Sequence, residues 1–153
     1  MLSTGVAKAQ FTNAQLQVSG LTCSMCSKAT EKSLRTLNFI SDIKTDLNNN
    51  LYVITFKKDV PVNLQAISKK VQGAGFSVNN LKVSFNMDKV KVDNNQFSYG
   101  GNNFQLLKTP EKSLSGEVSA TIVDKGFISP TAYKIYAGQY PDLNKAGIYH
   151  LSI

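Results

Sequence analysis

Residues 14–37, AQLQVSGLTCSMCSKATEKSLRTL, change their hydrophobic period part-way along. Residues 14–20 alternate apolar and polar side chains and end at Gly20, which predicts a strand. Residues 24–37 have helical spacing instead. One face of this helix contains Met25, Ala29, Leu34 and Leu37, and the basic residues Lys28, Lys32 and Arg35 fall on the other. A strand therefore leads into a helix, with Cys23 in the short loop between them and Cys26 in the first helical turn.

The same alternation of strand and helix continues after this stretch. The segments with strand character are 40–47, 51–56 and 76–85. A second helix is predicted at 62–72, where Gly73 and Gly75 end it. The order strand, helix, strand, strand, helix, strand is that of a ferredoxin-like βαββαβ domain, which we expect to span residues 14–85. Such a domain has a four-stranded antiparallel sheet with two helices on one face.

The remaining part of the chain, residues 86–153, has a different pattern of predicted elements. Strands are predicted at 87–93, 104–108, 117–123 and 148–153, separated by turn-forming segments. One short helix is predicted, with Ser129 as its cap and Pro130 at its first position. Several strands and one helix predict a small β-rich domain, an OB-like barrel or else a fragment of a β-sandwich. The fold class is therefore α+β.

The composition restricts the classes of partner. The net charge is +7, and residues 11–84 carry nine basic and four acidic side chains. Aromatic residues are not interleaved with these basic ones, so we expect no nucleic-acid binding. No stretch reaches the roughly 18 apolar residues of a membrane-spanning helix. The basic residues Lys28, Lys32 and Arg35 are either a docking surface for an acidic metal-transport or acceptor protein or an ordinary solvated face.

The N-terminal segment MLSTGVAKAQF contains the small-residue pattern Ala7-Lys8-Ala9. This is typical of the end of an export signal, with cleavage near Ala9. Residues 1–13 are therefore expected to be a residual signal or a disordered tail. The first interpretation predicts a periplasmic or secreted protein, and the second leaves a cytoplasmic location open.

The cysteine pair, Cys23 and Cys26, favours soft-metal chemistry. Two thiolates are enough for a two-coordinate ion such as Cu(I) or Hg(II), whereas a structural Zn(II) site takes four ligands. The one histidine, His150, lies far along the chain and is expected to be structural. Cys26 is expected in the first helical turn, where a helix N-terminus lowers a thiol pKa.

The motif GLTCSMC at residues 20–26, within this order of elements, resembles the heavy-metal-associated domain. That family includes copper chaperones and the periplasmic mercuric-ion binding protein, and its motif is Gly-Met-Thr/Ser-Cys-x-x-Cys. Leu21 replaces the usual methionine here. The stretch GAGFSV, residues 73–78, resembles the segment that places an aromatic or lysine side chain near the metal, here Phe76. The β-rich part resembles an extension found in some secreted members.

The resemblance implies a non-enzymatic protein that binds and transfers a soft metal ion. Cu(I) is the expected ion, with Hg(II) or Zn(II) as alternatives, and Cys23 and Cys26 are its expected ligands. Side chains expected around them are Thr22, Met25 and Phe76. Two other functions stay open: a thiol–disulfide oxidoreductase that uses the same cysteines, and an interaction module without a metal. No catalytic constellation is found in the sequence.

Overall fold

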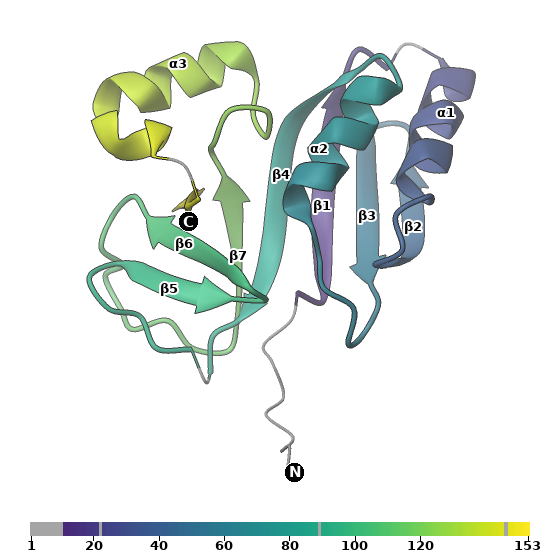
Figure 1. Cartoon of the computed structure of the whole chain (residues 1–153). Coiled ribbons are helices and arrows are strands. Elements are labelled where there is room, and N and C mark those ends of the chain that lie inside the picture. Colours follow the sequence, from purple (N-terminus) through teal and green to yellow (C-terminus); the bar gives the residue numbers. More distant parts are fainter. Residues whose placement is uncertain (1–10, 22, 89, 146) are drawn as a thin grey trace.

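The computed structural model describes residues 11–21, 23–88, 90–145 and 147–153 (Figure 1). The first half contains β1 (Asn13–Ser19), α1 (Ser24–Leu34), β2 (Ile40–Asp46), β3 (Leu51–Phe56), α2 (Leu64–Gly73) and β4 (Ser77–Asn86). The second half contains β5 (Gln96–Tyr99), β6 (Asn102–Leu106), β7 (Glu117–Ile122), α3 (Pro130–Gln139), the 3₁₀ helix η1 (Pro141–Asn144) and β8 (Tyr149–Ser152). The expected signal cleavage near Ala9 lies outside the described residues.

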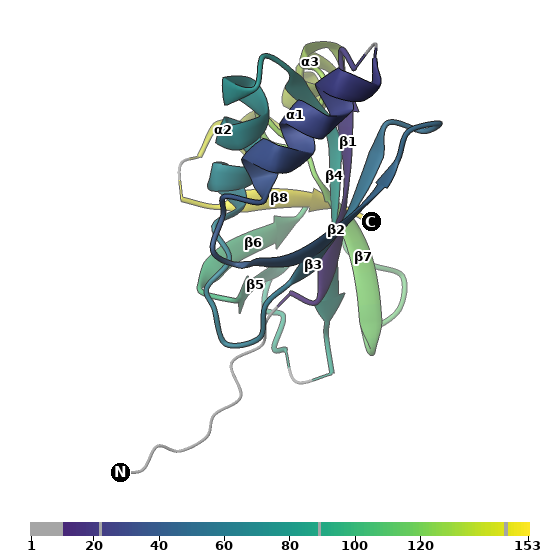
Figure 2. The same ribbon diagram turned by 90° about the vertical axis from the view of Figure 1, so that its right-hand side faces the viewer.

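The first half confirms the ferredoxin-like prediction. Its strands lie in the order β2-β3-β1-β4 and all pair antiparallel. Leu16 of β1 lies at the centre, opposite Tyr52 of β3 on one side and Leu81 of β4 on the other. Helices α1 and α2 lie together on one face of this sheet, as Figures 1 and 2 show.

The second half continues the same sheet, in the order β4-β7-β8-β6-β5. β7 pairs with the outer edge of β4, where Val83 lies opposite Ala120. β6 and β8 run parallel to each other. The β-rich prediction is confirmed, but the described strands form an open ladder from β2 to β5, so the OB-like barrel is not confirmed. The expected boundary between residues 85 and 86 falls at the last step of β4.

One predicted strand, 87–93, is wrong. The strand lies at Gln96–Tyr99 instead, after a tight turn in which Asn94 and Asn95 have φ values of 52° and 62°. Asp93 and Gln96 pair across that turn. Two consecutive residues with positive φ make the kind of turn that joins hairpin strands, and asparagine tolerates this conformation.

One hydrophobic cluster runs through both halves, and a second, smaller one around Val123, Ile128 and Leu143 packs against α3. Phe11 contacts Tyr99 and Phe104 of the second half, with ring centroids 5.0 and 5.9 Å apart. Phe85, at the end of β4, lies 5.0 Å from Phe104. These rings are buried, and their contacts belong to the same apolar cluster as Leu16. The two halves therefore share apolar packing as well as strand pairing.

The two helices bury different kinds of side chain. The buried residues of α2 are Leu64, Ile67, Ser68 and Val71, and those of α1 are Ser27, Thr30 and Leu34. The apolar face indicated by the sequence is therefore not the buried face, since Met25 is 80% exposed and Ala29 is also exposed. The prediction followed the apolar residues, whereas the sheet accepts small polar residues at this end of the helix.

Candidate metal centre

The loop from β1 into α1, here called the cysteine loop, lies at one end of the sheet (Figure 1). Cys23 ends this loop as the N-cap of α1, and Cys26 follows in the first helical turn. Gly20 has a φ of +91°, a conformation that favours glycine. A side chain there would also approach the ring of Phe76, since a Cβ on Gly20 would lie 3.3 Å from Phe76 Cδ1. Gly20 therefore lets the loop turn while Phe76, just after α2, packs against it.

Cys23 is the N-cap residue of α1. Its Sγ accepts a hydrogen bond from the backbone N–H of Cys26 at 3.2 Å. Its carbonyl accepts a second bond from the N–H of Ser27, also at 3.2 Å. Cys23 is exposed, Cys26 is partly buried, and the two thiols are not joined as a disulfide. The cap thus directs the sulfur of Cys23 toward the turn that contains Cys26.

This geometry favours the thiolate form of Cys23. Hydrogen bonding with the Cys26 side chain and then with the Cys26 backbone N–H lowers the pKa of Cys23 below its ordinary value of 9.0. The sequence predicted a helix N-terminal effect on Cys26; in the structure, a helix N–H also reaches the sulfur of Cys23. The reason is that the capping position aims its side chain at the free N–H groups.

The other predicted neighbours of the pair are distributed unevenly. Thr22 lies outside the described residues. Met25 extends into solvent beside the loop, at 80% exposure. Phe76 is half-buried and contacts the hydrophobic core as well as the loop. Of these side chains, that of Phe76 packs against the loop at Gly20, whereas Met25 interacts with Cys23 through its backbone.

The three predicted docking residues are all exposed, Lys28 and Lys32 on α1 and Arg35 at its C-cap, but they differ in their contacts. Arg35 Nε lies 2.9 Å from Glu31 Oε2, and its Nη2 donates to the carbonyl of Ile43 at 2.9 Å. Lys28 and Lys32 stand on the same exposed helix. Arg35 therefore links the end of α1 to β2 by a hydrogen bond. Lys28 and Lys32 are the better candidates for contact with a partner.

His150 lies on β8, in the second half of the sheet. It is buried at 1% exposure, and its Nδ1 lies 2.8 Å from Asp124 Oδ1. The backbone N–H of His150 donates to the other oxygen of Asp124 at 2.6 Å. Its Nε2 is buried and has no hydrogen-bond partner among the described residues. His150 is held by Asp124, which sequence reasoning missed because the two residues are distant in the chain.

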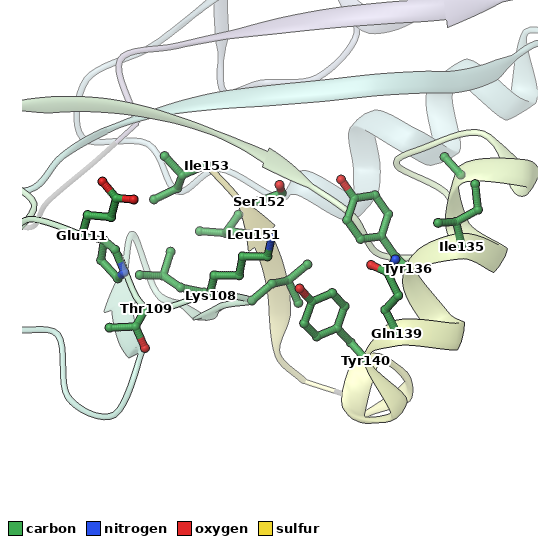
Figure 3. A pocket seen from close by; sticks show the side chains of 14 residues that line it. Lys108, Thr109, Glu111, Ile135, Tyr136, Gln139, Tyr140, Leu151, Ser152 and Ile153 are labelled. Atoms are coloured by element: carbon green, nitrogen blue, oxygen red, sulfur yellow. The ribbon is translucent and has the colours of Figure 1, made fainter.

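A groove of about 810 Å³ lies in the second half, between the chain after β6, the end of β8 and α3 (Figure 3). Tyr136 and Tyr140 line it from the α3 side, and Lys108 and Glu111 line it from the other side. It contains neither cysteine. Because a lysine and a glutamate both line it, the groove has no single charge that would select a ligand.

Metal-ligand chemistry is sparse in the rest of the described chain. The described residues contain no group of three or more His, Cys, Asp or Glu side chains placed to hold an ion. A four-ligand site of protein side chains therefore does not form within this part of the molecule. The capped thiol pair is the soft-ligand group that the described structure offers.

Residues 15–77 match the family described as the heavy-metal-associated domain. These residues belong to that family. The match contains β1, α1, β2, β3, α2 and the start of β4, together with both cysteines. The part of the chain after residue 77 lies outside the match. The heavy-metal-associated domain therefore accounts for the cysteine loop and for both helices that cover the first half of the sheet.

Several solved structures resemble the heavy-metal-associated domain of this chain. The putative copper-ion-binding protein from Bacillus anthracis str. Ames is 26% identical, over 48% of this chain and 99% of that one, with a TM-score of 0.39. CopP from Helicobacter pylori, in its apo form, is 27% identical, over 43% and 97%, with a TM-score of 0.38. The yeast copper transporter domain Ccc2a is 25% identical, over 44% and 90%, with a TM-score of 0.39.

No curated protein matches the chain. Among the described residues, none of the helices has the length and apolar character needed to cross a membrane.

Proposed function

We propose that this protein binds one soft metal ion through the thiolates of Cys23 and Cys26 and transfers it to an acceptor protein. The observation that supports this most strongly is the capped cysteine pair, in which Cys23 Sγ accepts the Cys26 N–H at 3.2 Å inside a heavy-metal-associated domain. The lowered pKa of Cys23 supports the proposal further, because the thiolate is the metal-binding form.

Cu(I) is the ion that this donor set favours. Two thiolates satisfy a two-coordinate Cu(I) or Hg(II) ion, and a third protein ligand is not needed. Zn(II) would need further ligands from a second molecule or from solvent. The exposure of Cys23 supports transfer, since thiolates of an acceptor can approach the ion and replace Cys23 and Cys26 one at a time.

The proposal is tested by anaerobic titration of Cu(I) against a chromophoric chelator. Cys23→Ser and Cys26→Ser should each lose at least about ten-fold in affinity, because one thiolate cannot hold a two-coordinate ion. His150→Ala is the control and should compete like the wild type, since His150 is buried in the second half. Affinity should also fall as the pH is lowered, because protons compete for the thiolates.

Two results would overturn the metal assignment. If both serine variants compete as well as the wild type, the thiols are not the ligands. If His150→Ala alone fails to bind, the ion is held in the second half of the molecule. The titration is repeated on oxidised protein, which should bind no Cu(I), because a disulfide between Cys23 and Cys26 removes both thiolates.

The partner surface is proposed to be the exposed side of α1, next to the cysteines. Lys28 and Lys32 give it positive charge, which would attract an acidic acceptor. Removal of Cu(I) by a disulfonated, negatively charged chelator should slow several-fold in a Lys28→Glu, Lys32→Glu double variant. Lys57→Glu, Lys58→Glu, at the end of β3, is the matched control and should leave the rate unchanged. If Cu(I) is removed from the Lys28→Glu, Lys32→Glu variant as fast as from the control, Lys28 and Lys32 are ordinary solvated residues and not a docking surface.

A second candidate function is favoured by the acidity of Cys23. An exposed thiol with a lowered pKa at a helix N-terminus is also the arrangement of the attacking cysteine in thiol–disulfide oxidoreductases. An insulin-reduction assay separates the two functions. Turnover that is lost in Cys23→Ser would favour the oxidoreductase, and Cu(I) binding without turnover favours the metal carrier.

A further inference from the structure

Helix α1 has little apolar packing at the end that bears the cysteines. Its buried side chains are Ser27, Thr30 and Leu34, at 4%, 0% and 0% exposure. The one apolar residue of the three, Leu34, lies at the last residue of the helix, away from the cysteine loop. Apolar burial therefore anchors the far end of α1, and the first turns depend on other contacts.

The contact at the first turns comes from Tyr52 on β3. This tyrosine is fully buried, and its hydroxyl donates a hydrogen bond of 2.8 Å to the backbone carbonyl of Ser27, the residue after Cys26. Ser27 and Thr30 are short side chains, so the long tyrosine can fill the space between the sheet and the helix. Burial raises the pKa of Tyr52, so the hydroxyl stays protonated and remains a donor at neutral pH.

The other polar contacts between α1 and the sheet lie farther along the helix. Thr45 donates to Glu31 Oε1 at 2.5 Å, and Arg35 donates to the carbonyl of Ile43 at 2.9 Å. Both of these bonds are only partly buried, whereas the Tyr52 bond is buried. Thr30 donates to the carbonyl of Cys26 at 3.1 Å, but this bond lies within α1. Among the described hydrogen bonds between the sheet and α1, the bond from Tyr52 is therefore the one nearest to the cysteines.

We propose that Tyr52 is a positioning residue of the metal centre, which holds the first turn of α1 so that the Cys26 N–H faces Cys23 Sγ. This inference rests on the proposed metal-binding function. The first turn carries the N–H groups of Cys26 and Ser27, which bond to the sulfur and the carbonyl of Cys23. A first turn that frays would lose both bonds. The sulfur of Cys23 would then lose the donor that favours its thiolate form.

The test compares Tyr52→Phe with Tyr99→Phe. Both tyrosines are buried, and the hydroxyl of Tyr99, on β5, accepts a hydrogen bond of 2.8 Å from the N–H of Asn86 at the end of β4. In Tyr52→Phe, Cu(I) affinity should fall by about two- to ten-fold, the range that one net hydrogen bond supplies. In Tyr99→Phe, Cu(I) affinity should stay that of the wild type, even where the free energy of unfolding falls.

A second readout uses the metal-free protein. The ¹³Cβ resonance of Cys23, followed by NMR as a function of pH, reports the ionisation of its thiol. The pH midpoint of this ionisation should be higher in Tyr52→Phe than in the wild type, and it should be unchanged in Tyr99→Phe. A purely structural role for Tyr52 would lower stability without moving this midpoint. Unchanged Cu(I) affinity and an unchanged midpoint in a folded Tyr52→Phe protein would overturn the proposal.

The outcomes also separate this inference from the proposed function. If the wild type and Cys23→Ser bind Cu(I) equally, the metal assignment fails, while the Cys23 midpoint still tests Tyr52 in the metal-free protein. If Tyr52→Phe does not fold, the wild type supplies the test. Its Tyr52 hydroxyl proton should be visible by NMR and exchange slowly with water. A proton in fast exchange would contradict a buried bond to Ser27 and overturn the proposal.

Discussion

Helices α1 and α2 cover the same face of the same sheet and are held there by different forces. α2 buries Leu64, Ile67 and Val71, so apolar packing fixes it along its length. The first turns of α1 bury Ser27 and Thr30 and are held by a hydrogen bond from Tyr52. Apolar packing is strong and has no preferred direction, whereas a hydrogen bond is weak and directional. The helix that bears the thiols is thus held by the more directional interaction.

The largest loss of stability expected from this comparison is at Ile67, which is fully buried in α2. Ile67→Ala should lower the free energy of unfolding by about 2–5 kcal/mol, because it leaves a cavity in the core. Thr30→Ala, at a buried position of α1, should cost only about 1 kcal/mol. Denaturant unfolding measures both. Equal losses would mean that the first turns of α1 contribute as much packing energy as α2.

A smaller loss of stability is expected from a substitution where α2 contacts the second half of the molecule. Ser68 Oγ donates to the carbonyl of Gly126 at 2.7 Å, and Gln72 donates to Ser68 at 3.2 Å. Ser68→Ala should lower the free energy of unfolding by about 1 kcal/mol, since it removes a bond between the halves. Ser98→Ala, at an exposed position of β5, is the control and should change stability by less than about 0.5 kcal/mol. A neutral Ser68→Ala would show that β4–β7 pairing and shared apolar packing alone join the halves.

The smallest effect is a pH dependence confined to α1. The hydrogen bond from Thr45, and then the bond and charge of Arg35, lower the pKa of Glu31 below its ordinary value of 4.5. The ionised carboxylate therefore stabilises the folded state above about pH 4.5 and loses this effect as the pH falls through the lowered pKa. Helix α2 has no acidic residue, so it has no matching dependence.

Glu31→Gln tests this dependence by unfolding at several pH values. The wild type should be more stable than Glu31→Gln near pH 7, and the difference should shrink as the pH falls below about 4. The gain is small because Glu31 and Arg35 are partly exposed. A difference that stays constant across this range would show that the Glu31 carboxylate does not act through its charge.

The sequence predicted the first half of the molecule well. The βαββαβ order and the cysteine loop follow from local periodicity, and the cap of α3 at Ser129 follows from local chemistry. The failures lie where local pattern and tertiary packing disagree. Met25 is apolar but exposed, and Ser27 is polar but buried. The turn at Asn94 and Asn95 was predicted, but the strand after it, Gln96–Tyr99, was missed because its four residues lie between two turn-forming segments.

The residues that support the cysteines were harder to find than the cysteines. Cys23 and Cys26 are recognisable from their three-residue spacing, which places Cys23 at the start of α1 and Cys26 in its first turn. Tyr52 is 26 residues beyond Cys26, in a strand whose aromatic and β-branched residues predict only burial. Nothing in that pattern indicates that its hydroxyl reaches a helix carbonyl. The pairing of Asp124 with His150 was missed for the same reason.

The sequence by itself determined the order of the first six elements and the place of the thiols, because hydrophobic period, turn residues and a three-residue cysteine spacing are local properties. The tertiary structure alone decided that β7 extends the sheet along β4, that a helix N–H reaches the sulfur of Cys23 and lowers its pKa, and that Tyr52 supports α1. These outcomes depend on contacts between segments far apart in the chain, where the geometry of hydrogen bonds and the fit of side chains, rather than local preference, select one arrangement.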